Sequence, residues 1–80
     1  ISLHAVDDKT RSEIMPINNK YPIDQLLTAC KNYAGIKNSR KITFEYILLK
    51  DVNDSDEDAL KLVKLIRDYQ IPANVNILIR

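Results

Sequence analysis

The chain has 80 residues and a formal net charge of +1, and 45% of its residues are hydrophobic while 29% are charged. These values are typical of one small globular domain and exclude a disordered chain, while the near-neutral charge neither requires nor excludes a nucleic-acid partner. One cysteine excludes an intrachain disulfide and a metal site made of cysteines alone. No apolar run approaches the roughly 20 residues of a membrane span, so we expect a cytoplasmic chain without a membrane partner.

The N-terminal part predicts a strand followed by a short helix. Residues 1–5 alternate between apolar and polar side chains, so Ser2 and His4 share one face of a short strand. The polar residues that begin at Asp7 favour a short helix. Pro16 ends this helix at or before the preceding residue, because a residue before proline avoids the helical conformation.

A second, longer helix is expected to begin near Pro22, which suits a first helical position because that position needs no N–H donor. Gly35, the only glycine, is the expected C-terminal cap. A basic loop over residues 37–41 then leads to the next element. The helix has one apolar face with helical spacing, formed by Ile23, Leu26, Leu27, Cys30 and Tyr33 or Ala34.

Residues 41–49 predict the central strand. The run is almost entirely apolar, as expected of a strand that is covered on both faces. Phe44 and Tyr46 point to one face, and Thr43 and Glu45 to the other. A carboxylate in such a strand is costly unless it has a partner, so we expect Glu45 to accept hydrogen bonds rather than to be exposed.

A third helix begins with a capping signature, because Ser55 is followed three residues later by Asp58. Pro72 ends this helix, and residues 74–79 form a last strand. The apolar stripe of this third helix is widened by Leu60 and Leu65. The stripe itself consists of Ala59, Leu62, Val63, Ile66 and Tyr69.

The order strand, helix, strand, helix, strand predicts an α/β fold with a parallel sheet, because the crossovers are long enough for parallel pairing. The chain starts and stops inside apolar runs, so we expect a piece of a larger protein. With helices on one face and polar groups on the other, this β-α-β-α-β unit is expected to be half of a parallel (βα) barrel with a polar lumen. The side chains on the polar face are Ser2, His4, Thr43, Glu45 and Asn76.

Several strings in this order resemble one family. They are Ser2-Leu3-His4-Ala5, RSEIMPIN over residues 11–18, Tyr21-Pro22, TFEYILL over residues 43–49 and Val52-Asn53-Asp54. The family is the radical-SAM methyltransferases that modify C2 of adenine in large-subunit (23S) ribosomal RNA and transfer RNA, with their antibiotic-resistance relatives. The resemblance implies that residues 1–80 are a single fragment, similar to the second half of a partial (βα)₆ barrel.

The resemblance also implies cofactors and site residues. The family uses S-adenosylmethionine and a [4Fe-4S] cluster, and Ser2, Leu3 and His4 match its S-adenosylmethionine site. Asn76 is a further candidate, although the residues after it depart from the family pattern, and Glu45 is a candidate because of its place on the polar face. The family's Cys-x-x-x-Cys-x-x-Cys loop is absent from this chain. We therefore assign no catalytic residue and no metal ligand here, and we expect the isolated chain to be inactive.

Two classes of function stay open. In the first, the chain is part of a radical-SAM RNA methyltransferase, with ribosomal and transfer RNA and the missing N-terminal half of the barrel as partners. In the second, it is a non-catalytic α/β fragment or binding module from a split or decayed gene. Each candidate also has an ordinary structural interpretation: His4 is a hydrogen-bonded side chain, Glu45 pairs with Lys41 or with a polar group of a neighbouring strand, and Cys30 is a small core residue.

Overall fold

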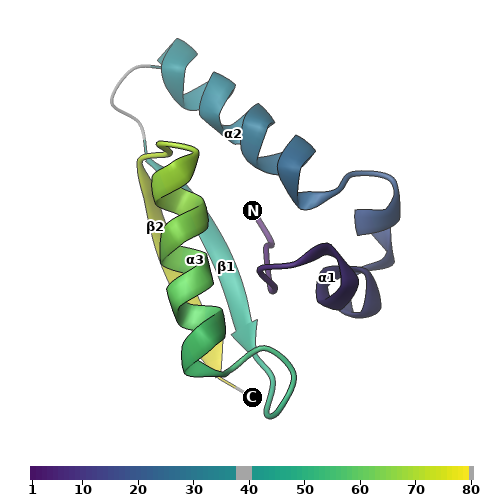
Figure 1. Ribbon diagram of the computed structural model, residues 1–80. Helices are drawn as coiled ribbons and strands as arrows, with labels where there is room; N and C mark the ends of the chain where they lie inside the picture. Colours follow the sequence, from purple (N-terminus) through teal and green to yellow (C-terminus); the bar gives the residue numbers. More distant parts are fainter. Residues whose placement is uncertain (38–40, 80) are drawn as a thin grey trace.

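The computed structural model describes residues 1–37 and 41–79 (Figure 1). The strands β1 (Ile42–Leu48) and β2 (Ala73–Ile79) pair in parallel with α3 (Asp56–Asp68) as their crossover, which confirms the predicted α/β fold with a parallel sheet. No helix in these ranges is long and apolar enough to cross a membrane. The elements are α1 (Asp8–Ile14), a 3₁₀ helix η1 (Pro16–Asn19), α2 (Ile23–Lys37), β1 (Ile42–Leu48), α3 (Asp56–Asp68) and β2 (Ala73–Ile79).

The N-terminal segment is a single bridge rather than the strand predicted over residues 1–5. Ser2 pairs with Glu45 in parallel, and the pairing stops there. His4 has a φ of 60°, which is the left-handed region and incompatible with an extended strand. The predicted N-terminal strand is therefore reduced to one residue pair, and the chain turns at His4 toward α1.

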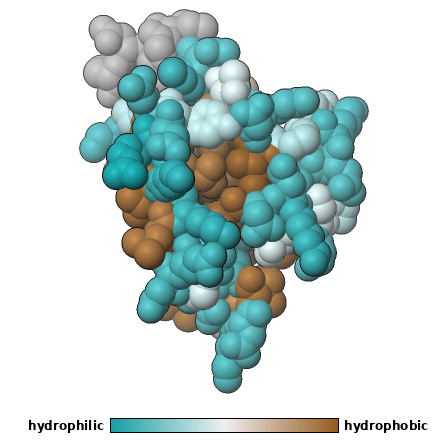
Figure 2. Space-filling model, viewed as in Figure 1, coloured by the Kyte–Doolittle hydropathy of each residue, from teal (hydrophilic) through white to brown (hydrophobic). Residues whose placement is uncertain are grey.

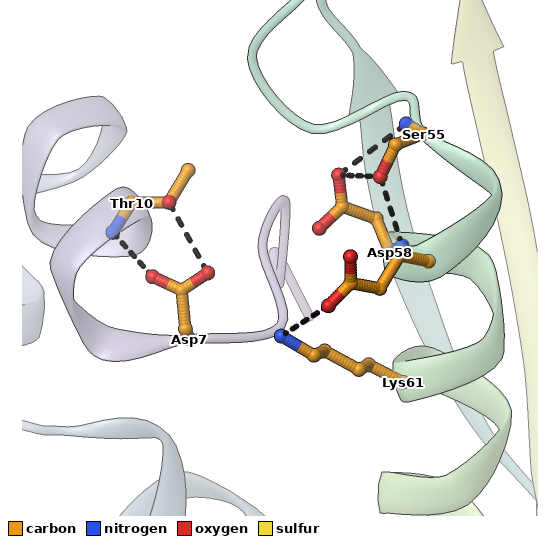
Figure 3. Close-up of polar contacts among 6 residues, drawn as sticks. Asp7, Thr10, Ser55, Asp58 and Lys61 are labelled. Atoms are coloured by element: carbon orange, nitrogen blue, oxygen red, sulfur yellow. Dashed lines mark hydrogen bonds and ion pairs between the residues drawn. The ribbon is translucent and has the colours of Figure 1, made fainter.

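Side-chain caps fix the starts of two helices (Figure 3). The Asp7 carboxylate accepts a hydrogen bond from the Thr10 N–H at 2.8 Å and begins α1. The Ser55 hydroxyl accepts one from the Asp58 N–H at 3.0 Å, while the Asp58 carboxylate accepts from the Ser55 N–H at 3.3 Å. The predicted capping box is therefore confirmed, and it fixes the residue at which the crossover helix α3 begins after β1.

The ends of α1 and α2 differ in how well the sequence predicted them. The helix α1 ends with Met15 as its cap, directly before Pro16, as predicted. The prediction that Gly35 caps α2 is wrong, because the helix continues through Gly35 to its end at Lys37. Residues 38–40 of the predicted basic loop lie outside the part of the chain that the structure describes.

The C-terminal end of α3 is closed by a backbone motif that contains no glycine. Gln70 has a φ of 54°, and the Ile71 N–H donates to the Ile66 carbonyl at 3.2 Å. This bond closes six residues and is the Schellman arrangement, which turns the chain sharply after a helix. The turn buries Ile71 and directs the chain into β2.

The core lies on one face of the sheet. Ile42, Phe44 and Tyr46 of β1 are buried, while Thr43 and Glu45 between them are exposed, so the predicted faces of β1 are confirmed. Figure 1 shows α3 lying across β1 and β2. The residues that pack against the buried face of β1 come from the N-terminal segment and both long helices, and they include Leu3, Val6, Ile23, Leu27, Cys30, Leu62, Leu65 and Ile66.

The opposite face of the sheet is open within the described residues, which corrects the prediction that β1 is covered on both sides. Asn74 and Asn76 of β2 are exposed on it together with Thr43 and Glu45. Several apolar side chains are also more exposed than their spacing predicted, namely Leu60, Val63 and Ile77 at 72%, 62% and 45%. The fold therefore has more apolar surface than its own elements cover.

Candidate functional site

The polar side chains of the open face form a row across the sheet. Ser2 is bridged to Glu45, and Glu45 is in register with Asn76. Neighbouring strands are about 4.8 Å apart, so these three residues are adjacent on the same face. The sequence placed Glu45 between His4 and Asn76, but the register puts Ser2 opposite Glu45, and His4 lies beyond Ser2.

His4 is bonded to β1 through its ring and to the loop after β1 through its carbonyl. The Ile47 N–H donates to His4 Nδ1 at 2.9 Å, and Asn53 Nδ2 donates to the His4 carbonyl at 2.7 Å. Burial lowers the pKa of His4, and the charge of Arg11 acts in the same direction while Glu45 opposes it. His4 is therefore held as a neutral imidazole at the end of the row.

Leu3, the middle residue of the Ser2-Leu3-His4 tripeptide, anchors the N-terminal segment to the core and to β1. Its side chain is fully buried in the core. Its N–H donates to the Glu45 carbonyl at 2.9 Å, and its own carbonyl accepts from Arg11 Nε at 3.0 Å. All the polar groups of Leu3 are thus in use, so it fixes its two neighbours and offers no free group to a ligand.

Glu45 stands on the open face without a protein partner. Among the described residues its carboxylate makes no hydrogen bond and no ion pair, and the side chain is exposed. The prediction that Glu45 is tolerated because it accepts hydrogen bonds is wrong for this structure, and it does not pair with Lys41. Water can solvate the carboxylate on an uncovered face, which removes the cost of burying it.

Arg11 is a functional candidate that the sequence analysis did not single out. Its side chain is 4% exposed. Its Nη2 donates to the Ser2 carbonyl at 2.9 Å, its Nε to the Leu3 carbonyl at 3.0 Å, and its Nη1 to Asn18 Oδ1 at 2.9 Å. The guanidinium thus holds the backbone of the N-terminal segment by its carbonyls at Ser2 and Leu3. The sequence over residues 11–18 held the information needed to find this contact. It contains the cation of Arg11 and the amide of Asn18, which the intervening helical turns bring together.

Asn18 connects the hydrogen bonds of Arg11 to the start of α2. It is 2% exposed, and its amide nitrogen donates to Ser12 Oγ at 2.9 Å and to Asp8 Oδ1 at 3.2 Å. The same Asp8 oxygen accepts from the Ile23 N–H at 2.9 Å. An acidic oxygen at a helix N-terminus is favourable, so one partly buried network joins the N-terminal segment, α1 and α2.

Asn53 completes the support on the other side. Its amide nitrogen donates to the carbonyls of His4 and Ile47, both at 2.7 Å, and its Oδ1 accepts from the Leu49 N–H at 2.7 Å. Its own carbonyl accepts from the Tyr46 hydroxyl at 3.0 Å. Burial raises the pKa of Tyr46 to about 12, so this phenol stays a donor at neutral pH. Asn53 therefore ties the loop after β1 to the end of the row.

The donors present do not fit an iron–sulfur cluster. Within the described ranges no group of three His, Cys, Asp or Glu side chains comes together to hold a metal ion. The single thiol, Cys30, is buried in the core, and burial raises its pKa. A cluster needs several accessible thiolates, so its ligands would have to come from other residues than these.

An apolar hollow of about 460 Å³ lies apart from the polar row. Figure 2 shows apolar surface in a hollow near the centre of the visible face. Its lining among the described residues carries no charged side chain, so it suits the packing of apolar groups rather than the binding of a polar ligand. The residues that line it are Ile1, Leu26, Ala29, Cys30, Tyr33 and Ile42.

No protein-family model matches the chain, but curated proteins and a crystal structure do. A dual-specificity RNA methyltransferase RlmN of Rhizorhabdus wittichii is 58% identical over 78 residues, which are 98% of this chain and 19% of that protein. The protein of the same name from Parvibaculum lavamentivorans is 59% identical over the same shares of each chain. The crystal structure of a radical SAM methyltransferase from Sphaerobacter thermophilus superimposes with a TM-score of 0.88 at 45% identity, and the match covers 95% of this chain and 21% of that one.

The curated relatives and the crystal structure match nearly the same share of this chain. The chain spans about a fifth of the length of the curated relatives it matches and a similar share of the crystal structure. The resemblance predicted from the sequence strings is confirmed: over nearly its whole length, this chain is similar to one stretch of the dual-specificity RNA methyltransferases named RlmN and to one stretch of a radical SAM methyltransferase of known structure.

Proposed function

We propose that this chain supplies part of the S-adenosylmethionine site of a radical-SAM enzyme that methylates C2 of adenine in ribosomal and transfer RNA. The observation that carries the proposal is the row of Ser2, Glu45 and Asn76, with His4 at its end, on the open face of a sheet. The names of the relatives, an RNA methyltransferase and a radical SAM methyltransferase, support the reaction class. We place this activity in the cytoplasm.

The same proposal extends to the architecture. We infer that the N-terminal segment, β1 and β2 are the fourth to sixth strands of a partial (βα)₆ barrel. Two features support this: residues of both long helices pack on one face of the sheet, and the polar side chains stand on the other face. The N-terminal half of the barrel would then continue the sheet and turn the open face into a lumen.

The chemistry of the row suits a ligand with charges of both signs. Ser2 offers a hydroxyl, Asn76 an amide, and Glu45 an acceptor for a cationic group. S-adenosylmethionine carries an ammonium, a carboxylate and a sulfonium, and when bound it supplies the methyl group. The residues of this chain would bind and orient it, while the iron–sulfur cluster would be held elsewhere in the protein.

A full-length chimera tests this proposal, in which the chain replaces the 78 matching residues of the Rhizorhabdus wittichii relative. We expect the chimera to transfer methyl groups to RNA when S-adenosylmethionine and reductant are supplied. Glu45→Gln should keep the fold and weaken cosubstrate binding about tenfold, because it removes one charge-assisted contact. Gln25→Glu, the reverse exchange on an exposed position of α2, is the matched control and should change neither property.

The alternative is a non-catalytic α/β module, and the single buried thiol is the observation that favours it for the chain alone. The chimera separates the two functions. A folded chimera that fails to methylate RNA, while the parent protein methylates it under the same conditions, would rule out the enzymatic proposal and leave the module.

A further inference from the structure

The pairing between the N-terminal segment and β1 stops in an unusual way. The Glu45 N–H donates to the Ile1 carbonyl at 2.7 Å, and the Leu3 N–H donates to the Glu45 carbonyl at 2.9 Å. In a parallel ladder the next bond would run from the Ile47 N–H to the Leu3 carbonyl. That bond is missing, and the Ile47 N–H donates to His4 Nδ1 instead.

Arg11 accounts for the change of partner. Its Nε occupies the Leu3 carbonyl and its Nη2 occupies the Ser2 carbonyl, at 3.0 and 2.9 Å. The planar guanidinium matches two neighbouring acceptors, which the single ammonium of a lysine does not. The Leu3 carbonyl accepts from Arg11, while the Ile47 N–H donates to the imidazole ring.

The ring is then held in one tautomer. A nitrogen that accepts a hydrogen bond from a backbone N–H carries no proton, so the proton of neutral His4 is on Nε2. Nε2 makes no hydrogen bond to the described residues, and these residues contain no buried side-chain nitrogen without a partner. Nε2 therefore reaches solvent and is available as a donor. The left-handed backbone of His4, a conformation that is costly outside glycine, keeps the ring in this position.

We propose that Arg11 is a positioning residue: by occupying the Ser2 and Leu3 carbonyls it gives the Ile47 N–H to His4 Nδ1, so that His4 presents Nε2–H to an acceptor oxygen of the bound ligand. His4 thus has a structural nitrogen and a binding nitrogen. The ligand part of this inference rests on the proposed function, whereas the tautomer and the role of Arg11 do not.

Paired substitutions of His4 in the full-length chimera test the two nitrogens. In His4→Asn the side-chain oxygen lies near the position of Nδ1, so the melting temperature should stay close to the original. Its affinity for S-adenosylhomocysteine, which lacks the transferable methyl group, should fall about tenfold. In His4→Gln the acceptor for Ile47 is lost, and the melting temperature should fall by several degrees. Equal destabilisation by the two variants would overturn the division of roles.

The role of Arg11 is read from the tautomer of His4. Nitrogen NMR of the histidine-labelled chimera should show a protonated Nε2 and an unprotonated Nδ1, in signals identified by their absence from His4→Gln. Arg11→Lys should mix the two tautomers and weaken S-adenosylhomocysteine binding, whereas Arg67→Lys on α3 is the matched control. A proton on Nδ1 in the unsubstituted chimera, or an Arg11→Lys variant that matches the control in both readouts, would overturn the proposal. The expected tautomer without any S-adenosylhomocysteine binding would support the positioning role and contradict the proposed function.

Discussion

Three buried polar side chains at the end of the N-terminal segment replace one rung of a β-ladder. Arg11 takes the Leu3 carbonyl, His4 takes the Ile47 N–H, and Asn53 takes the two carbonyls of His4 and Ile47. Each such bond contributes about 1 kcal/mol, but leaving one of these buried groups unpaired costs roughly 1–3 kcal/mol. Removing any one of these three side chains should therefore lower the free energy of unfolding, because it leaves a buried backbone group unpaired.

Protonation of His4 should weaken the folded state. Burial lowers the pKa of His4 from its ordinary value of 6.5 in the folded chain. Between that lowered pKa and 6.5, the unfolded chain binds more protons, so the free energy of unfolding rises with pH. The contribution of neutral His4 is thus fully present above 6.5 and is lost as the pH falls below it. The charged groups that act on the ring are Glu45, Arg11 and the N-terminal amine.

Urea unfolding of the chimera at about pH 8 and about pH 5 measures this effect. The unsubstituted protein should lose more stability on acidification than His4→Asn, which has no imidazole to protonate. The same loss in both proteins would show that other groups, and not His4, set the acid sensitivity.

At the scale of the elements, the helix ends show what a sequence can and cannot predict. The capping box of α3 was predicted because its residues are three apart and act locally. Gly35 failed as a cap because a glycine inside a helix is only moderately unfavourable, and α2 continues past it to Lys37. The real C-terminal turn of α3 uses Gln70, a residue with no preference for that conformation.

Gln70→Gly should therefore stabilise the fold. Gln70 is exposed and has a φ of 54°, where glycine avoids the steric cost of a Cβ atom. The gain should be up to about 1 kcal/mol, since glycine also makes the unfolded chain more flexible. Denaturant unfolding of the chimera measures it, with Gln70→Ala as the control that keeps the Cβ atom. An equal effect of glycine and alanine would show that the turn is not strained.

The candidate site was predictable only in part, for a related reason. Alternation within β1 correctly separated Phe44 and Tyr46 from Thr43 and Glu45. The register that sets Ser2, rather than His4, opposite Glu45 depends on the left-handed turn at His4, which no local pattern announces. Arg11 could not be assigned because its partners are backbone carbonyls, which every residue has.

At the scale of the whole molecule, the chain leaves much of its apolar surface uncovered. Leu60 and Val63 are exposed on α3, and Ile77, Leu78 and Ile79 are exposed near the end of β2. The sheet has two strands, and the N-terminal segment adds a single bridge to it. Small units of this kind bury too little surface for high stability, and open sheet edges favour association.

We therefore expect the isolated chain to be weakly stable or self-associating. Sedimentation velocity over a range of concentrations should detect dimers or larger species, and thermal unfolding should begin at low temperature. Leu60→Glu with Val63→Lys should reduce the association, whereas Gln25→Glu should not. A monodisperse monomer with a melting temperature above about 65 °C would contradict the half-barrel proposal.

The row of Ser2, Glu45 and Asn76 has a consequence for which insertions and deletions the chain can accept. Its three members come from distant parts of the sequence and meet only through the pairing of the strands. An extra residue in the connection between α2 and β1 would lengthen that connection, which costs little. One extra residue between Ile42 and Phe44 would instead move Phe44 to the open face and Glu45 to the core face. Length variation among functional versions of this chain should therefore be confined to its connections and absent from β1.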